Sequence, residues 1–399
     1  MIRQLYSGMV AMIMALLPLE INALTPDEVA SAILESSPAA EATRKATEAA
    51  EAAAGAMNTL PDPEVEGEYL VASGDGANRW GGGIRWGLEW PGVYGARHGE
   101  SVERAKAARL SGEAEQTARL GEIKKLLLEY ILQEKQMATL RSVSNATDSI
   151  MILAGQAMKA GEITKLDMNK LRLEKASIAA GIAETEEARE GTLTALSGLY
   201  GSDCSELLGL MTCEFPTLEL PAGLIAEEAA GQSAAVVAAE AEARAAKRAG
   251  KVATAESLPG ISIGYRHAFE DNTHFNGASL GISIPLFSAG KKKKTAKTEA
   301  MAAMAQAEAV RAETESVLRG NMKRLNALKR RIEEIEPIIA DGNNMALLQK
   351  AYKGGLLTVI EYLNERNYFT NAQLDLLSLK YAGSVALIEI NTLTRTETR

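Results

Sequence analysis

The 399-residue sequence contains few aromatic residues, few histidines and few cysteines. Phe, Trp and Tyr together make up 5% of the chain, and its three histidines are His98, His267 and His274. These histidines show no spacing typical of a metal site or a catalytic triad, and no base and nucleophile can be paired in one pocket. We therefore expect a protein that is not an enzyme and that binds neither a metal nor a cofactor.

An excess of positive charge is also lacking, because 52 acidic residues outnumber 43 basic ones and the formal net charge is −9. A protein that binds nucleic acid needs clustered basic residues to contact phosphates, so we expect no nucleic-acid partner. The one basic run, Lys291–Lys294, is either a solvated helix start or a contact with anionic lipid head groups. Few prolines and abundant Ala, Glu, Lys and Leu predict long helices.

The N-terminal segment has the pattern of a secretory signal. Arg3 precedes an apolar stretch from Gly8 to Leu19, and Ala23 is a suitable cleavage position. A buried helix or a membrane anchor is the alternative, although the apolar stretch is short for a membrane span. We predict a signal peptide over residues 1–23 and export of the chain. No cysteine follows the cleavage position, so a lipoprotein anchor is not indicated.

All three tryptophans lie in the segment from Trp80 to Trp90. Trp80, Trp86 and Trp90 share one face of an extended strand, because strand side chains alternate between two faces. The other face carries Arg85 and Glu89. The segment would extend about 33 Å, or about 24 Å across a membrane if tilted, which matches the apolar band of an outer-membrane barrel. A half-buried strand of a soluble core is the alternative.

The sequence repeats at an offset of 194 residues. Pro91 and Pro285 have this separation, and so do the similar segments 158–167 and 352–361. Each unit predicts a helix, two strands, a very long helix, a turn containing glycine and another helix. We divide the chain into a signal peptide (1–23), a first repeat (24–200), a connecting segment (201–222) and a second repeat (223–399).

Four predicted strands, two in each repeat, alternate between apolar and polar side chains. They cover residues 64–72, 80–90, 260–269 and 277–287, and polar loops at 73–79 and 270–276 join them into hairpins. The apolar face is predicted to contact lipid, and besides the tryptophans it carries Ile282 and Ile284. The polar face is predicted to line a lumen, and it carries Glu64, Glu66, Glu68, Arg85, Glu89 and Arg266.

Residues 97–159 and 290–352 predict two very long helices, each up to about 95 Å in length. The points where these helices are expected to bend or break are Gly121, Gly155, Gly320, Pro337 and Gly342. Four strands of this length leave two free edges, which cannot stay unpaired in hydrocarbon, and a single-chain barrel needs about eight strands. Several copies must therefore share one barrel, with their helices projecting from one side.

Cys204 and Cys213 are the only cysteines in the sequence. In an exported protein, two cysteines at this short separation favour a disulfide that closes a small loop, because a metal site would need further ligands nearby. Two free thiols in a structural loop are the alternative.

These features resemble the TolC-like family of outer-membrane efflux proteins, over essentially the whole mature chain. The similarity is carried by residues 24–40, by the second hairpin and its exit (258–269 and 278–291), and by the closing segment 334–390. Pro337 and the style of the closing segment, which includes Tyr352, Gly355 and Tyr381, resemble the heavy-metal and multidrug efflux branch.

The resemblance implies an α+β membrane protein that forms a homotrimer. Twelve strands, four from each chain, would form a barrel among outer-membrane lipids, and the helices would continue it as a periplasmic α-helical barrel. The resemblance also places a gate where helix reverses into helix, at Gly161, Thr164, Asp167, Gly355, Thr358 and Glu361. Glu361 matches an acidic constriction residue of the family, whereas Asn364, at a second such position, is neutral here.

The function implied is that of a passive, gated duct that exports small toxic molecules or metal ions. Its partners would be a periplasmic adaptor and an inner-membrane efflux pump. The alternative is a structural tether that spans the periplasm and is anchored by the barrel, although a tether would not need an acidic constriction. A soluble coiled-coil scaffold does not explain the four strands.

Overall fold

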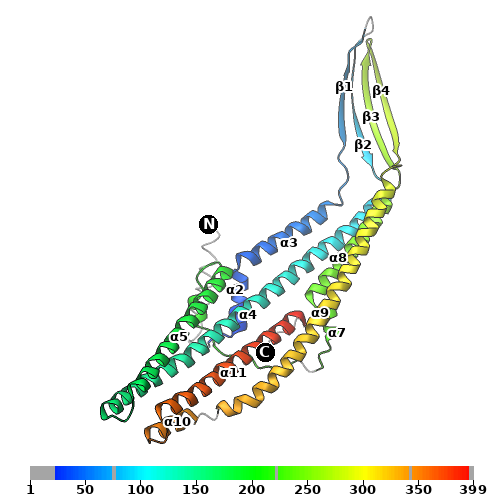
Figure 1. Ribbon diagram of the computed structural model, residues 1–399. Helices are drawn as coiled ribbons and strands as arrows, with labels where there is room; N and C mark the ends of the chain where they lie inside the picture. Colours follow the sequence, from blue (N-terminus) through cyan, green and yellow to red (C-terminus); the bar gives the residue numbers. More distant parts are fainter. Residues whose placement is uncertain (1–22, 74–77, 221–222, 341–343, 395–399) are drawn as a thin grey trace, which may run out of the picture.

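The computed structural model describes residues 23–73, 78–220, 223–340 and 344–394. The chain is elongated, with a sheet at one end and long helices that run from the sheet to the opposite end (Figure 1). Two sequence-based predictions lie outside the described residues: nearly all of the signal peptide, which falls in residues 1–22, and the bend at Gly342.

The sheet consists of two antiparallel hairpins side by side, in the order β1-β2-β3-β4. β1 (Glu64–Leu70) and β2 (Arg79–Leu88) form the first hairpin, and β3 (Gly260–Glu270) and β4 (Thr273–Ser283) form the second. β2 pairs with β3, so the two hairpins are joined although they are far apart in sequence. β1 and β4 are the edge strands, and neither has an outer neighbour within the described ranges.

Three strands end earlier than the sequence pattern predicts, and the first of them, β1, ends at Leu70 instead of residue 72. β2 ends before Glu89, so Glu89 and Trp90 lie outside it, and Trp90 is the N-cap of the following helix. Pro91 explains this boundary, because proline cannot donate a ladder hydrogen bond but fits the first position of a helix. β4 ends at Ser283, so Ile284 also lies beyond its strand.

The second hairpin closes in a two-residue turn at Asp271 and Asn272, whose φ angles are 45° and 59°. Positive φ at both central positions is the mark of a type I′ hairpin turn, and Asp and Asn tolerate it better than other non-glycine residues. β4 therefore begins at Thr273. The polar loop predicted for 270–276 is wrong, because most of that segment is strand.

Glycines in β2 allow the two hairpins to approach closely. A Cβ atom at Gly81 would lie 2.7 Å from the carbonyl oxygen of His267, and one at Gly83 would lie 2.7 Å from that of Tyr265. A side chain at either position would therefore push β2 and β3 apart. Gly81 and Gly83, which lie between Trp80 and Trp86, therefore allow β2 to pair with β3.

The helices occur in a similar order in the two halves of the chain. In the first half, α2 (Pro26–Ser36) and α3 (Pro38–Ala56) precede the hairpin, and α4 (Pro91–Ala160) and α5 (Lys165–Tyr200) follow it. In the second half, α7 (Ala226–Gln232) and α8 (Ala234–Ala255) precede the hairpin, and α9 (Ala289–Ala340), α10 (Asn344–Lys353) and α11 (Val359–Thr394) follow it. A short helix, α6 (Ser205–Gly209), lies between the halves. None of the described helices is both long enough and apolar enough to cross a bilayer.

α4 is one unbroken helix of 70 residues, which corresponds to about 105 Å. It continues through Gly121 and Gly155, so neither glycine breaks the helix, and of the predicted bend or break only the bend stays a prediction. Gly121 has a different use, because a Cβ atom there would lie 2.7 Å from Thr392 Oγ1 of α11. This glycine lets α4 and α11 pack closely.

The second long stretch is not a single described helix. α9 continues through Gly320 and Pro337 and ends at Ala340, and α10 begins at Asn344. Pro337 lies inside α9, so the described part of the helix continues through it although proline removes one helix hydrogen bond.

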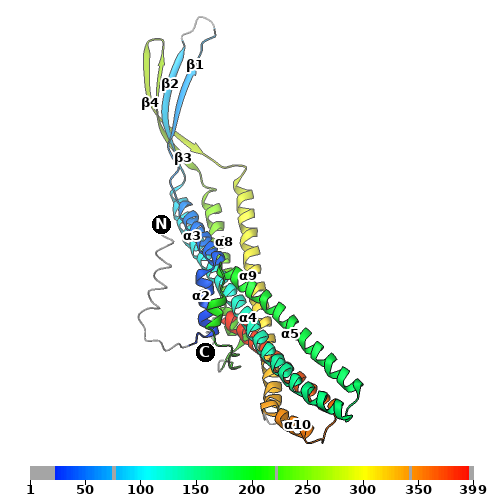
Figure 2. The same cartoon turned by 90° about the vertical axis from the view of Figure 1, so that its left-hand side faces the viewer.

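The hydrophobic core lies between the helices rather than under the sheet. One cluster joins α2, α4, α5 and α6 near the middle of the chain, and it includes Val29, Ile123 and Leu196, all 0% exposed. Another joins α4, α5, α10 and α11 around Leu171 and Tyr362. This second cluster lies at the end farthest from the sheet, where both helical turns are found (Figures 1 and 2).

Both cysteines are free thiols, so the structure does not contain the predicted disulfide. Cys204 is buried in the cluster near the middle of the chain, and its Sγ atom lies 3.4 Å from Ser197 Oγ of α5. Cys213 is half-buried, and burial raises the pKa of its thiol. Packing of Cys204 against α5, rather than against Cys213, agrees with the alternative of two unpaired thiols.

Candidate functional sites at the sheet and at the helical tip

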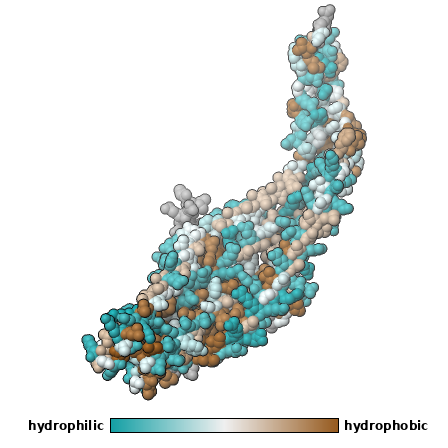
Figure 3. All heavy atoms as spheres, in the orientation of Figure 1, coloured by the Kyte–Doolittle hydropathy of each residue, from teal (hydrophilic) through white to brown (hydrophobic). Residues whose placement is uncertain are grey.

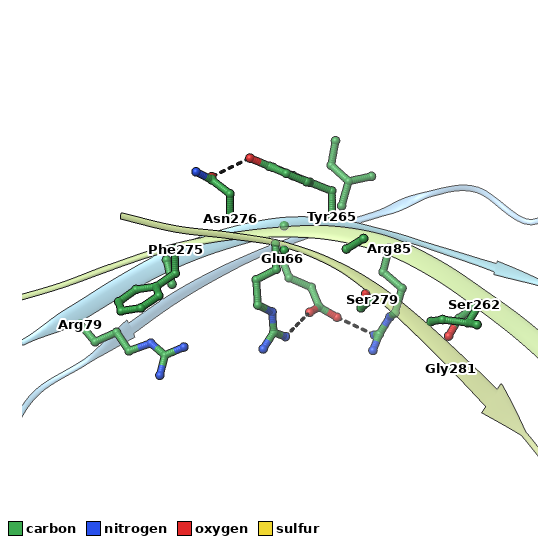
Figure 4. A pocket seen from close by; sticks show the side chains of 16 residues that line it. Glu66, Arg79, Arg85, Ser262, Tyr265, Phe275, Asn276, Ser279 and Gly281 are labelled. Atoms are coloured by element: carbon green, nitrogen blue, oxygen red, sulfur yellow. Dashed lines mark hydrogen bonds and ion pairs between the residues drawn. The ribbon is translucent and has the colours of Figure 1, made fainter. Parts of the chain in front are cut away.

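One face of the sheet carries a connected set of charged side chains. The strand register places Glu64 opposite Arg85, and it places Glu66 and Arg266 on either side of Gly83. Arg85 Nη2 lies 2.7 Å from Glu64 and 2.5 Å from Glu66, and Arg266 Nη2 lies 3.6 Å from Glu66 (Figure 4). The predicted polar residues of three strands are therefore brought together as ion pairs.

A hollow of about 490 Å³ lies on this face of the sheet. Small residues of β4, Gly277, Ser279 and Gly281, leave the space open, and Arg79 and Phe275 lie at its other end (Figure 4). The paired charged side chains are 41% to 65% exposed, so water screens these ion pairs and they contribute little to stability. Their main effect is to make this face polar and hydrated.

Two of the predicted polar-face residues stand apart from these ion pairs. Glu68 is exposed on the same face, two residues beyond Glu66. Glu89 lies instead at the junction between sheet and helices, where Arg97 donates hydrogen bonds to Glu89 at 2.7 Å and to Glu256 at 2.8 Å. Burial alone would raise the pKa of Glu256, but hydrogen bonds from Arg97 and Lys292 lower it. Glu89 therefore helps to fix the junction.

The opposite face of the sheet is apolar and largely exposed. Trp80 is 47% exposed and Ile282 is 69% exposed, whereas Trp86 is half-buried and donates its indole N–H to a backbone carbonyl before β1 at 2.7 Å. Trp90 and Ile284 are exposed as well, just beyond the ends of their strands. Figure 3 shows hydrophobic residues on the surface of the sheet and at the far end of the helices. Such exposed apolar surface is typical of contact with lipid or with another protein.

The first helical turn joins α4 to α5. Gly161 ends α4 in the left-handed conformation, with a φ angle of 81° that favours glycine. Thr164 then caps α5: its hydroxyl donates to Asp167 at 2.7 Å, and the backbone N–H of Asp167 donates back to that hydroxyl at 3.2 Å. Hydrogen bonds from the Thr164 side chain and backbone lower the pKa of Asp167.

The second helical turn joins α10 to α11 and has the same construction. Gly355 has a φ angle of 72°, and the hydroxyl and the backbone N–H of Thr358 both donate to Glu361 at 2.8 Å. Hydrogen bonds from the Thr358 backbone and side chain lower the pKa of Glu361. Asn364 lies one turn further along α11 and is exposed. The acidic residue of each turn is thus committed to capping a helix.

A buried arginine near the second turn was missed by the sequence analysis. Arg366 of α11 is 0% exposed, and it donates hydrogen bonds to Thr147 Oγ1 of α4 at 2.6 Å and to Glu174 Oε1 of α5 at 2.7 Å. The signal for it was present, because Val359, Tyr362 and Arg366 follow helical spacing and place a charge on an apolar stripe. Arg366 links the second half of the chain to both tip helices of the first.

Arg366, Thr147 and Glu174 together form what we call the arginine network. A hollow of about 620 Å³ lies beside it, between α4, α10 and α11. Tyr362 and Phe369 of α11 line it, together with Ser142 and Val143 of α4. In the part of the chain that the structure describes, no group of three or more His, Cys, Asp or Glu side chains could hold a metal ion.

Comparison with solved structures identifies the fold. No protein-family model and no curated protein matches the sequence. Among solved structures, that of CusC, described in terms of transmembrane channel formation, has a TM-score of 0.78 at 16% identity and covers 93% of this chain and 92% of that one. The outer membrane channel CmeC of Campylobacter jejuni has a TM-score of 0.77 at 14% identity, covering 92% of this chain and 85% of that one. The chain has the fold of TolC-like outer-membrane channels.

The open state of the Neisseria gonorrhoeae MtrE outer membrane channel agrees, with a TM-score of 0.76, 16% identity, and coverage of 94% of this chain and 90% of that one. The resemblance inferred from the sequence is therefore confirmed in the fold. A helix-rich chain with one four-stranded sheet is what this TolC-like fold contains, and the match extends over nearly the whole chain.

Proposed function

We propose that the chain is one subunit of a TolC-like outer-membrane channel of a tripartite efflux system. The observation that carries this proposal is a sheet with one apolar face, one charged face and two open edges. Open edges in hydrocarbon leave backbone groups unpaired, which costs several kcal/mol for each group. The sheet therefore requires further copies, and three chains would close a barrel of twelve strands.

In that barrel the ion-paired face lines the lumen and the tryptophan face contacts outer-membrane lipid. All helices leave the sheet at the same end (Figure 1), so the helical part stands on one side of the membrane. A signal peptide exports the chain, and the similarity to TolC-like channels favours the periplasmic side for the helices, where those of three chains form a duct. Solute moves through the duct passively, and no catalytic step is required.

The helical tip is the proposed gate, and the arginine network holds it closed. Arg366 fixes α11 against α4 and α5, so splaying of α11 from these helices breaks the hydrogen bonds to Thr147 and Glu174 together. Glu361 already caps a helix, so closure rests on Arg366 rather than on an acidic ring at the turn. A partner that binds the splayed state shifts the population toward opening.

The proposed partners are a periplasmic adaptor, which contacts the tip, and an inner-membrane pump that delivers the cargo. The cargo class is small toxic molecules or metal ions, in keeping with the resemblance to the heavy-metal and multidrug branch. The two turns around Gly161, Thr164 and Gly355, Thr358 are exposed at the end of the helices, where an adaptor can reach them.

The test is the native mass of the full chain extracted from outer membranes in detergent, followed by conductance in planar bilayers. Three copies of the chain and a conductance that rises when the tip is destabilised are expected. A monomer, or recovery of the chain in the soluble fraction, would show that the apolar sheet face has another purpose and that the channel proposal is wrong.

A further inference from the structure

An exposed apolar pair and a run of lysines follow β4 directly. Leu286 is 76% exposed and Phe287 is 92% exposed, and Lys291–Lys294 lie in the first two turns of α9. Along the chain, a strand with one apolar face is thus followed by two exposed apolar side chains and then by four positive charges. This order of residues is typical of a segment that leaves hydrocarbon and enters the head-group layer of a membrane.

The lysines of this run lie on different faces of α9. Ala296 and Ala300 are buried and mark the face that packs against the other helices. With 3.6 residues per turn, Lys292 falls near that face, and its Nζ atom lies 3.3 Å from Glu256 Oε2. Lys291 and Lys294 fall on the opposite face, one turn apart, and both are exposed.

The run does not stabilise the helix that carries it. The first turn of a helix has a partial positive charge, so lysines there are unfavourable, and the first turn of α9 contains no acidic residue. Within the described ranges, Lys292 has the only ion pair of the four, and Lys291 and Lys294 form none. An anion supplied from outside the chain would offset this repulsion.

The matching segment of the first half lacks both features, although its backbone also leads from a strand into a long helix. At the offset of 194 residues, Val93 stands in place of Phe287 and is 0% exposed. Arg97 stands in place of Lys291, and it is held by Glu89 and Glu256. A connection from a strand to a long helix in this fold therefore needs neither an exposed phenylalanine nor lysines without an ion pair.

We propose that Leu286, Phe287, Lys291 and Lys294 form a binding site for anionic phospholipids of the inner leaflet of the outer membrane. The lysines take the phosphate and the two apolar side chains enter the acyl region. The site rests on the proposed function, because only a sheet placed in the membrane puts the start of α9 at the head groups. The proposed site specifies which class of lipid the channel binds and which residues bind it.

Native mass spectrometry of the detergent-purified full chain, titrated with phosphatidylglycerol or with phosphatidylethanolamine, tests the site. The wild-type trimer is expected to bind phosphatidylglycerol at least about fivefold more tightly, because each lysine at an anionic surface contributes about that factor. The double variant Lys291→Gln/Lys294→Gln should weaken phosphatidylglycerol binding about 25-fold, because the two factors multiply, and should leave phosphatidylethanolamine binding unchanged. Phe287→Ser should weaken both lipids equally.

The matched control is Lys323→Gln/Arg324→Gln, which removes the same charge from exposed positions of α9 about 50 Å from Lys291. It should bind both lipids as the wild type does. Equal binding of the two lipids by the wild-type trimer, or unchanged phosphatidylglycerol binding by the lysine variant, would overturn the site while leaving the channel intact. Loss of trimer in Phe287→Ser without loss of lipid would assign Phe287 to a contact between subunits instead. A monomeric wild-type chain would contradict the channel itself.

Discussion

The two halves of the chain share an order of elements but differ in the side chains that those elements carry. Both tips use a left-handed glycine and a threonine that caps the next helix. Yet Arg366 is fully buried in α11, whereas Arg172, which precedes it by 194 residues, is exposed on α5. A repeated backbone therefore does not repeat its interactions, and the buried Arg366 has an exposed counterpart in Arg172.

The segments that lead from the sheet into the long helices also differ between the halves. Arg97 is bound by two carboxylates, whereas Lys291 is bound by none among the described residues. The second half thus carries both the proposed gate contact at Arg366 and the proposed lipid contact at Lys291 and Lys294.

The largest difference between the halves should appear when the two arginines are exchanged for methionine. Arg366→Met leaves Glu174 without its partner and should cost about 3 kcal/mol of tip closure, as expected when one member of a buried pair is removed. Arg172→Met, at an exposed position, should change stability by less than about 0.5 kcal/mol. Single-channel conductance measures the open population, and native mass confirms the trimer. Equal open populations in the two variants would contradict a closing role for Arg366.

The pairing of the hairpins offers the next test, within β2. Gly83→Val would place a side chain against the backbone of β3 and should destabilise the sheet by about 1–3 kcal/mol. Gly87→Val on the same strand meets no atom within 4 Å at its Cβ position and should be nearly neutral. Thermal unfolding and the yield of trimer distinguish them. If both variants behave alike, close approach is not what the glycines provide.

A smaller effect is expected at the two tips, where the halves should be equivalent. Thr164→Ala and Thr358→Ala each remove a capping hydroxyl and should destabilise the following helix by about 1 kcal/mol. Amide hydrogen exchange at the start of α5 and α11 measures this directly. Similar loss of protection at both tips, with increased conductance only for Thr358→Ala, would support a gate in the second half. Increased conductance for Thr164→Ala alone would place it in the first.

The smallest effect is the pH dependence of these caps. Hydrogen bonds from Thr164 and Thr358 lower the pKa of Asp167 and of Glu361. The contribution of each cap is therefore complete above the unfolded-state pKa values of about 3.9 and 4.3, and it is lost as the pH falls through the lower folded values. Amide exchange at both tips should increase only in that acidic range. Asp167→Asn should remove the dependence at the first tip and leave it at the second.

Much of the fold could be predicted from local patterns in the sequence. The alternation around Glu64, Arg85 and Trp80 fixes the two faces of the sheet, because a strand has a period of two residues. The pairs Thr164–Asp167 and Thr358–Glu361 predict helix starts, because capping needs only residues three positions apart. The predicted ends of the strands were less accurate, because the proline at Pro91 and the tight turn at Asp271 each set a boundary that the alternating pattern does not show.

The sequence by itself determined the element order, the polar and apolar faces of the sheet and the helical turns, because each depends on neighbours within a few residues. The tertiary structure alone decided which distant residues meet. The sequence predicts a bend or a break at Gly121, but the structure shows that this glycine allows α11 to pack closely on α4. Only the packed structure shows that Arg366 donates hydrogen bonds to both α4 and α5. It also left Cys204 against Ser197 rather than in a disulfide. A helical period shows which residues of one helix share a face, but only the packed helices decide which residues of other helices contact that face.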